Sequence, residues 1–281
     1  MDRCLLEERI IMKKYEKVLL ACGAAAVAIP TFLLAPGRAT KGQKAPFWGR
    51  NFAHRGLHSR DKSVPENSLK AFELASAAGY GMELDVQLSK DGQVVVFHDD
   101  DLKRVCGVEG KIWDYTFSEL QKFPLCGTEE RIPLFSDVLN TVRGRGAIIC
   151  ELKNGPRNRE LCKKTYDLLA AYTGEVCIES FNPFIVAWFR FHAPELLRGQ
   201  LATDKYDDRS ALQAFLLSRC LLNFLARPQF IAYKLVKRPL AVRFSEALGA
   251  MRVAWTSHEP RNEKGQDAVI FEFYRPRISF K

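Results

Sequence analysis

Short apolar runs that end in polar residues recur along the chain from about residue 50 onward. Most of these runs are followed by a segment whose apolar residues repeat with helical spacing. This alternation, with about eight such units, favours a (β/α)8 barrel of the TIM type. A glycine- and proline-punctuated stretch at 102–134 predicts a small irregular insertion, with a helix near 136–142. The predicted strands are residues 52–53, 82–88, 94–97, 147–150, 176–178, 198–202, 230–232 and 252–255.

Two of these runs, at 82–88 and 94–97, have different patterns. The first alternates strictly, with Glu83, Asp85 and Gln87 on one face, so we expect these polar side chains to face the barrel interior or its mouth. Its apolar face should pack against the outer helices. The second run is continuously apolar, as in a parallel strand buried on both faces. The Ser-Lys-Asp-Gly turn between them leaves two alternatives, an antiparallel hairpin that interrupts the barrel or a return of the chain without a helix.

An uncharged apolar run of eighteen residues occupies positions 18–35. It is barely long enough to cross a hydrocarbon core about 30 Å thick. Because basic residues lie on both sides and no clean cleavage site follows, we expect an uncleaved single-pass anchor in the cell membrane. A cleaved signal peptide and a buried core helix are the alternatives, and the balanced flanking charge does not predict orientation. The expected organisation is an N-terminal region at 1–47, with a basic segment, a membrane helix and a linker, and a barrel domain at 48–281.

Composition narrows the classes of partner. The formal net charge is +9, but no basic run is interleaved with aromatic residues, so we expect no nucleic-acid partner. Attraction to an anionic membrane surface or substrate is compatible with this charge. The eight cysteines form no Cys-x-x-Cys pair, which argues against a zinc ribbon and a thioredoxin-like redox site. Nothing in the sequence indicates an oligomeric state.

Two histidines stand at the ends of predicted strands. His54 is followed by an arginine and His98 by Asp99, which can orient the imidazole ring of His98. Imidazoles placed in this way suit a general acid and a general base. The remaining histidines have no comparable context, and we expect surface or structural roles for them: His58, His192 and His258.

Paired carboxylates point to a metal ion. Glu83 and Asp85 lie two positions apart on one strand, so their side chains point the same way. Two like charges this close resist ionising together unless a cation is present. We therefore expect one divalent ion, Mg²⁺ or Ca²⁺, with Glu151 at the end of another strand as a third oxygen ligand.

Cationic and aromatic side chains stand beside these acids. Arg55 and Lys153 would bind phosphate oxygens, the first through its planar fork and the second as a point charge. Lys153 can also pair with Glu151 on the same strand face. Trp255, at the end of the last predicted strand, is either a wall of the substrate cavity or part of the core.

Several short motifs follow one another in a characteristic order. They are His54-Arg55-Gly56, Pro65-Glu66-Asn67-Ser68, Glu83-Leu84-Asp85, Lys90-Asp91-Gly92, Phe97-His98-Asp99, Leu102 with Arg104 and Gly107, Glu151-Leu152-Lys153, and Trp255-Thr256. In these motifs the chain resembles the glycerophosphodiester phosphodiesterase family over about residues 52–256. The resemblance implies a metal-dependent hydrolase that splits glycerophosphodiesters into glycerol 3-phosphate and an alcohol. It implies the same metal, acid–base and phosphate roles inferred above, and adds that Glu66 would orient the glycerol or assist at the metal.

The end of the chain departs from the family pattern. Phe-Glu-Phe-Tyr-Arg-Pro at 271–276 stands where many members carry Thr-Asp-x-Pro, so the headgroup preference stays open. With a membrane anchor, intact lysophospholipids join the water-soluble diesters as expected substrates and would yield a lysophosphatidate. Two alternatives remain: a membrane-tethered barrel that binds phosphodiesters or a partner without turnover, and a phospholipase of related barrel type. Both direct attack by water and a cyclic phosphate intermediate are compatible with the resemblance.

Overall fold

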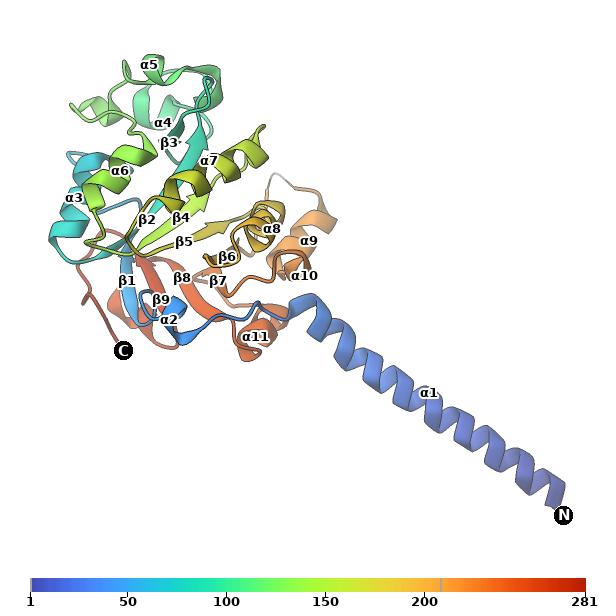
Figure 1. The fold of residues 1–281 in the computed structure, drawn as a ribbon. Helices are drawn as coiled ribbons and strands as arrows, with labels where there is room; N and C mark the ends of the chain where they lie inside the picture. Colours follow the sequence, from blue (N-terminus) through green and yellow to red (C-terminus); the bar gives the residue numbers. More distant parts are fainter. Residues whose placement is uncertain (1, 208) are drawn as a thin grey trace.

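A closed barrel of eight parallel strands forms the body of the protein (Figure 1). The computed structural model describes residues 2–207 and 209–281, without the side chains of residues 2–12, 18, 19 and 21. The sheet closes because the first strand pairs with both the second and the last. The barrel strands are β1 (Arg50–Ala53), β2 (Gly81–Leu88), β4 (Ile148–Leu152), β5 (Val176–Ser180), β6 (Leu197–Ala202), β7 (Phe230–Lys234), β8 (Met251–Ser257) and β9 (Ala268–Phe271). The predicted (β/α)8 barrel is confirmed.

Helices connect most of these strands on the outside of the barrel (Figure 1). The side chain of Ser68 accepts a hydrogen bond from a backbone N–H of the first of these helices, as expected of an N-cap. A 3-10 turn, η3 (Pro260–Glu263), joins the last two strands instead. The outer helices are α3 (Leu69–Ala77), α6 (Phe135–Val142), α7 (Asn158–Ala170), α8 (Pro183–His192), α9 (Ala211–Ser218), α10 (Asn223–Ala226) and α11 (Leu240–Ala247).

The prediction for residues 94–97 was wrong. These residues form β3 (Val94–Val96), which runs antiparallel to β2 and is not a barrel strand. The hairpin alternative holds because the turn returns the chain directly: the backbone N–H of Ser89 donates to the carbonyl of Gln93 at 3.0 Å, and Gly92 has a φ of 77°. The eighth barrel strand is β9, which the sequence analysis did not predict.

The irregular insertion predicted after this hairpin is present. It contains short helical segments that pack around their own apolar cluster, in which Leu102, Ile112 and Leu120 are fully buried. This cluster also takes in Val95 of β3, so the hairpin supports the insertion above the barrel mouth. The segments are α4 (Lys103–Cys106), η1 (Ile112–Asp114), α5 (Phe117–Leu120) and η2 (Leu125–Gly127).

The core has two layers. As expected from their alternation, the apolar residues of β2 face outward, where Leu84 and Val86 pack among Phe72 of α3 and Phe135 of α6. The barrel interior is a second apolar cluster, closed at the N-terminal ends of the strands by Phe47. This side chain comes from the segment after α2 (Lys41–Lys44). The opposite end of the interior is left to polar side chains.

A long helix, α1 (Asp2–Leu34), projects away from the barrel (Figure 1). Its segment Lys13–Leu34 is long and apolar enough to span a membrane. Its last turn is fixed to the barrel, because Arg227 donates hydrogen bonds from Nη1 to the carbonyls of Phe32 and Ala35 at 2.7 and 2.9 Å. The ring of Phe32 stacks on Phe224 of α10 with centroids 5.7 Å apart.

Candidate active site

Three buried carboxylates meet at the C-terminal ends of neighbouring strands. Glu83 and Asp85 point inward from β2 and Glu151 from β4, and one oxygen of each lies within 4.8 Å of the others. Burial raises the pKa of Glu83 well above its usual value, and the negative charges of Asp85 and Glu151 raise it further. Burial also disfavours the charge on Asp85, but His98, Lys153 and Arg55 outweigh burial and hold its pKa below the usual range.

This donor set fits a hard divalent cation. All three ligands are carboxylate oxygens, and Asp85 Oδ1 is buried without a hydrogen-bond partner. The side-chain amide of Asn67 donates to the other oxygen of Asp85 at 2.9 Å, which fixes the orientation of that carboxylate. A bound cation would compensate the repulsion among the three acids.

A fourth acid was missed by the sequence analysis. Glu179 of β5 is 1% exposed and lies beside Glu151 in the strand register. Burial raises its pKa well above the usual value, and Glu83 and Glu151 add to the effect. Its position at the polar end of a predicted strand was a signal that could have identified it.

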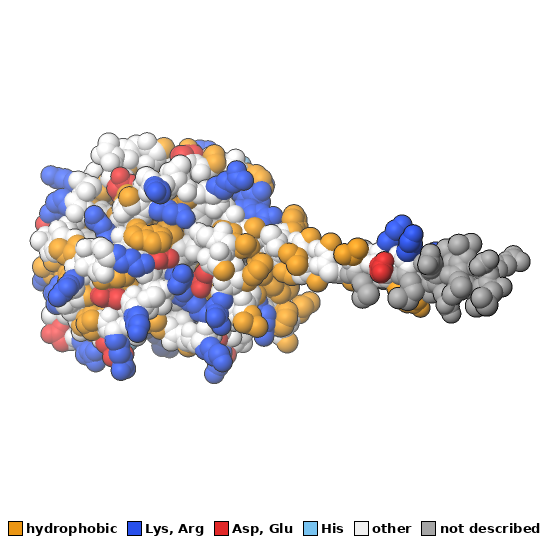
Figure 2. Space-filling view, turned by 90° about the horizontal axis from the view of Figure 1, so that it is seen from below, with side chains coloured by type: hydrophobic (Ala, Val, Ile, Leu, Met, Phe, Trp, Pro, Cys, Tyr) orange, Lys and Arg blue, Asp and Glu red, His pale blue; other side chains and the backbone are white. Residues whose placement is uncertain are grey.

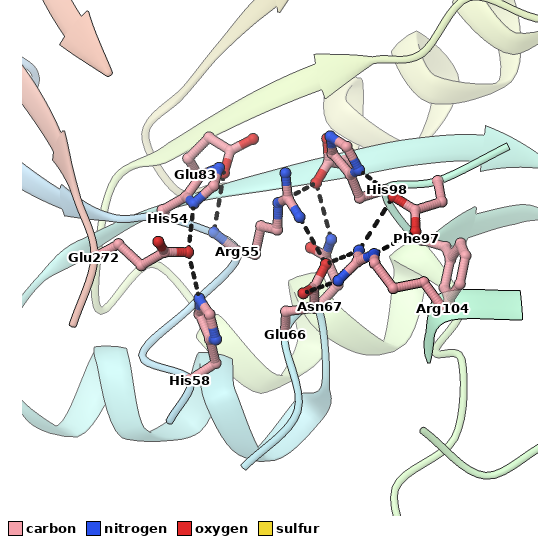
Figure 3. Close-up of polar contacts among 12 residues, drawn as sticks. His54, Arg55, His58, Glu66, Asn67, Glu83, Phe97, His98, Arg104 and Glu272 are labelled. Atoms are coloured by element: carbon pink, nitrogen blue, oxygen red, sulfur yellow. Dashed lines mark hydrogen bonds and ion pairs between the residues drawn. The ribbon is translucent and has the colours of Figure 1, made fainter. Parts of the chain in front are cut away.

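His54 is held by a residue that follows β9. Because a carboxylate can only accept, His54 Nδ1 donates to Glu272 Oε1 at 3.0 Å, which leaves Nε2 on the side of Glu83, 4.0 Å from Oε2 (Figure 3). His58 donates to the same oxygen of Glu272 from Nε2, also at 3.0 Å. Burial is the main cause that lowers the pKa of His54, and the hydrogen bond to Glu272 offsets part of it.

Glu272 and His58 were not predicted as site residues. These two and His54 also lie close enough together to hold a metal ion, and in the structure both histidines are hydrogen-bonded to Glu272. The contact between Glu272 and His58 joins residues more than two hundred positions apart, so no local pattern reveals it. The two histidines hold the pKa of Glu272 below its usual range, although burial opposes them.

His98 is supported by a chain of charged groups. Its Nδ1 donates to Asp99 Oδ1 at 2.6 Å, as anticipated. Arg104 in turn donates from Nε to Asp99 Oδ2 at 2.6 Å and from both terminal nitrogens to Glu66 (Figure 3). Arg104 was recognised only as part of a motif, because its partners are set by the fold of the insertion.

The two predicted phosphate-binding cations border the acids. Arg55 Nη1 donates to Glu66 Oε1 at 2.7 Å, and its Nε lies 3.6 Å from Asp85 Oδ2. Lys153 Nζ lies 2.9 Å from Glu151 Oε1 and 3.5 Å from Asp85 Oδ1. Both cations therefore line the acidic cluster, and Lys153 makes the ion pair to Glu151 considered from the sequence.

A cavity of about 40 Å³ opens at this end of the barrel. Most of the predicted site residues line it, and Trp255 forms its wall together with Phe181, with ring centroids 5.7 Å apart. Glu66 lies behind Arg55 and Arg104 instead. His192 hydrogen-bonds within its own helix, α8, away from the cavity. The residues lining the cavity are His54, Arg55, Glu83, His98, Glu151, Glu179, Phe181, Leu201, Trp255 and Ile270.

Comparison with known proteins agrees with this geometry. The family model for the glycerophosphoryl diester phosphodiesterase family matches residues 54–273, which is most of the chain. The chain belongs to this family. It is 25% identical to a phosphodiesterase of Oleispira antarctica solved in complex with the product sn-glycerol-3-phosphate, with a TM-score of 0.68 over 81% of this chain and 94% of that chain.

Two curated relatives of this phosphodiesterase family member are more similar in sequence than the Oleispira antarctica protein, but over a smaller part of the chain. A glycerophosphodiester phosphodiesterase of Caldanaerobacter subterraneus is 36% identical over 163 residues, covering 53% of this chain and 65% of that protein. A human lysophospholipase D is 34% identical over 146 residues, covering 47% of this chain and 45% of that protein. The chain therefore spans less than two thirds of the length of either relative.

Proposed function

We propose that this protein is a metal-dependent phosphodiesterase that hydrolyses glycerophosphodiesters to glycerol 3-phosphate and an alcohol. The observation that carries the proposal is the cavity in which two imidazoles and Arg55 lie beside the carboxylate cluster, with Lys153 paired to Glu151 at the border of that cluster. Family membership and the product named for the Oleispira antarctica structure support the same reaction class.

Glu83, Asp85 and Glu151 would hold the metal ion, with Mg²⁺ and Ca²⁺ the ions that suit an all-oxygen set. When bound, a divalent cation stabilises negative charge that develops on phosphoryl oxygens. Arg55 and Lys153 would hold the remaining phosphate oxygens from the border of the cluster. Glu66 would fix Arg55 in place, and Trp255 would form the substrate wall.

His54 and His98 would transfer the protons. Each ring donates from Nδ1 to a carboxylate, so its Nε2 is the atom free to accept or deliver a proton. One imidazole would take a proton from the attacking hydroxyl while the other gives one to the oxygen of the leaving alcohol. Glu272 and Asp99 would keep the two rings in the required tautomer.

The N-terminal region would anchor this activity to the cell membrane. Residues Lys13–Leu34 make a helix about 33 Å long at 1.5 Å per residue, enough for a hydrocarbon core of about 30 Å. In this proposal residues 1–47 tether the catalytic domain formed by residues 48–281. Retention of the full chain in membranes after an alkaline wash, and its release by detergent, would support the anchor.

The test is hydrolysis of glycerophosphocholine by the full-length chain, with identification of the products. We expect glycerol 3-phosphate and choline from the wild type, and a loss of turnover of roughly 10²–10⁴-fold in His54→Ala. His192→Ala is the matched control, because this histidine lies on α8 outside the cavity. Equal turnover in the two variants would contradict the assigned role of His54.

Lysophospholipids extend the proposal to a second substrate class. The human relative named lysophospholipase D supports this extension, since it is 34% identical over 146 residues. The corresponding products would be a lysophosphatidate and the headgroup alcohol.

A further inference from the structure

A second hollow lies beside the catalytic cavity. It is a groove of about 230 Å³ between the start of α8 and α9. Phe181 lines both hollows, so the groove and the catalytic cavity adjoin at this ring. Its other apolar lining comes from Phe184, Tyr206, Leu216, Leu217 and Leu222.

The lining of the groove contains both polar and apolar side chains. Near the cavity the groove is lined by Asn154, which directly follows Lys153, and by Asn182, whose amide donates to Asn154 at 2.6 Å. The side of the groove formed by α9 and its flanking segments combines three leucines with two polar side chains, namely Leu216, Leu217, Leu222, Gln213 and Arg209. A ligand matched to both hollows has an anionic phosphodiester head and an aliphatic tail.

The outer surface around this groove is apolar as well. Phe184 of α8, Leu212 of α9 and Leu240 of α11 are between 68 and 79% exposed. The last turn of α1 packs against α10 and lies beside α11. Figure 2 shows hydrophobic side chains gathered where α1 leaves the globular body. If α1 spans a membrane, this flank of the barrel is the part held nearest to the bilayer.

We propose that the groove between α8 and α9 is the subsite for the acyl chain of a lysophospholipid, which enters from the lipid surface beside α1. The inference rests on the phosphodiesterase activity proposed above. It adds a lipid substrate class and the residues that would contact its acyl chain. The phosphodiester would lie over the carboxylate cluster and the chain would pass Phe181 into the groove. In the reaction water adds its oxygen to phosphorus, the bond from phosphorus to the headgroup oxygen breaks, and the proton goes to the released alcohol.

The first test compares two substrates of the full-length chain in phosphatidylcholine nanodiscs. Glycerophosphocholine has no acyl chain, whereas lysophosphatidylcholines of increasing short chain length fill the groove progressively. We expect kcat/KM to rise about fourfold per methylene, following the free energy of burying each group, until the groove is full. A kcat/KM that does not depend on chain length would overturn the proposal.

Groove variants localise the effect. Leu217→Glu places a charge in the groove, and Leu216→Trp fills the groove without adding a charge. The second variant tests the proposal if the first does not fold. We expect the ratio of kcat/KM for lysophosphatidylcholine to that for glycerophosphocholine to fall about tenfold or more. Leu74→Glu on α3 is the matched control, since this leucine is exposed on another face of the barrel and its ratio should not change. An unchanged ratio in both groove variants would contradict the proposal.

A labelling experiment separates the proposal from the activity on which it rests. A lysophosphatidylcholine with a photoactivatable diazirine at the end of its chain is bound in EDTA, irradiated, and its attachment sites are mapped by mass spectrometry. Labelling of α9 and the start of α8 supports the acyl subsite even if neither diester is hydrolysed, an outcome that would refute only the phosphodiesterase. Labelling confined to α1 and α11 would overturn the subsite even if glycerophosphocholine is cleaved.

Discussion

The two ends of the barrel are formed by the same strands but have opposite chemistry. At the N-terminal end the inward side chains are apolar, and Phe47 stacks on Phe52 with ring centroids 5.9 Å apart. Two positions further along the same strands the inward side chains are polar: His54 follows Phe52, and Glu151 follows Ile149. The first end is closed by packing, and the second is organised by hydrogen bonds and ion pairs.

This difference separates the residues that stabilise the fold from those that perform the chemistry. A buried apolar side chain contributes about 1.5–3 kcal/mol to folding. Buried carboxylates such as Glu83 and Glu179 oppose folding, because burial penalises their charge. We therefore expect substitutions at the N-terminal end to change stability and substitutions at the C-terminal end to change turnover.

The largest effect is expected at the C-terminal end. His98→Ala should lower kcat for glycerophosphocholine by roughly 10²–10⁴-fold, because the variant lacks one of the two proposed proton-transfer groups. The melting temperature should stay near that of the wild type, since the ring is 30% exposed and leaves no large cavity. A kcat within a few-fold of wild type would remove His98 from the mechanism.

Next in size is an effect at the opposite end. Phe47→Ala should lower the free energy of unfolding by about 3–5 kcal/mol, because it removes a buried ring and leaves a cavity at the N-terminal end of the barrel. In thermal unfolding of the full chain in detergent, this corresponds to a fall of about 10 °C. At temperatures where the variant is folded, kcat should match the wild type; a large loss of kcat there would mean that the two ends are not independent.

A smaller effect is expected from the support of His98. Arg104→Ala leaves Asp99 and Glu66 without their shared cation, and should lower kcat about 10–100-fold while KM changes little. Arg104→Lys keeps the charge but loses the fork, so it should recover only part of the rate. If both the alanine and the lysine variant had the same kcat as the wild type, Arg104 would have no positioning role.

The smallest effect is expected on the free energy of unfolding, when one of the buried acids is replaced. Glu179→Gln keeps the shape of the side chain and removes one carboxylate from the cluster, so it should stabilise the chain in EDTA by about 0.5–2 kcal/mol. Urea unfolding at neutral pH measures the change. Destabilisation by this substitution would show that Glu179 makes favourable interactions in its ionised form.

The sequence predicted the barrel because most of its strands have local signatures. The apolar runs and their polar ends identified seven of the eight barrel strands, while Val94–Val96 was assigned wrongly and β9 was overlooked. A buried β-branched run looks the same in a hairpin strand as in a parallel strand, and only the Ser-Lys-Asp-Gly turn distinguished the two. β9 is short and follows β8 through η3 without an outer helix, so the helix–strand alternation did not point to it.

The site was predictable to the extent that its residues lie in local motifs. His54, His98 and Glu151 stand at the ends of predicted strands and Glu83 and Asp85 on the polar face of one, and the structure brings all five to one cavity or its border. Their supports were not predictable. The supporting residues depend on tertiary contacts between distant segments or on the fold of the insertion, and they are Glu272, His58 and Arg104.

The most direct test of the account is the metal dependence of glycerophosphocholine hydrolysis by the full-length chain. If Glu83, Asp85 and Glu151 hold a divalent ion that the reaction requires, EDTA should abolish turnover and Mg²⁺ or Ca²⁺ should restore it. Glu151→Gln should then need a higher concentration of the ion for half-maximal rate. Turnover that continues unchanged in EDTA would contradict the account.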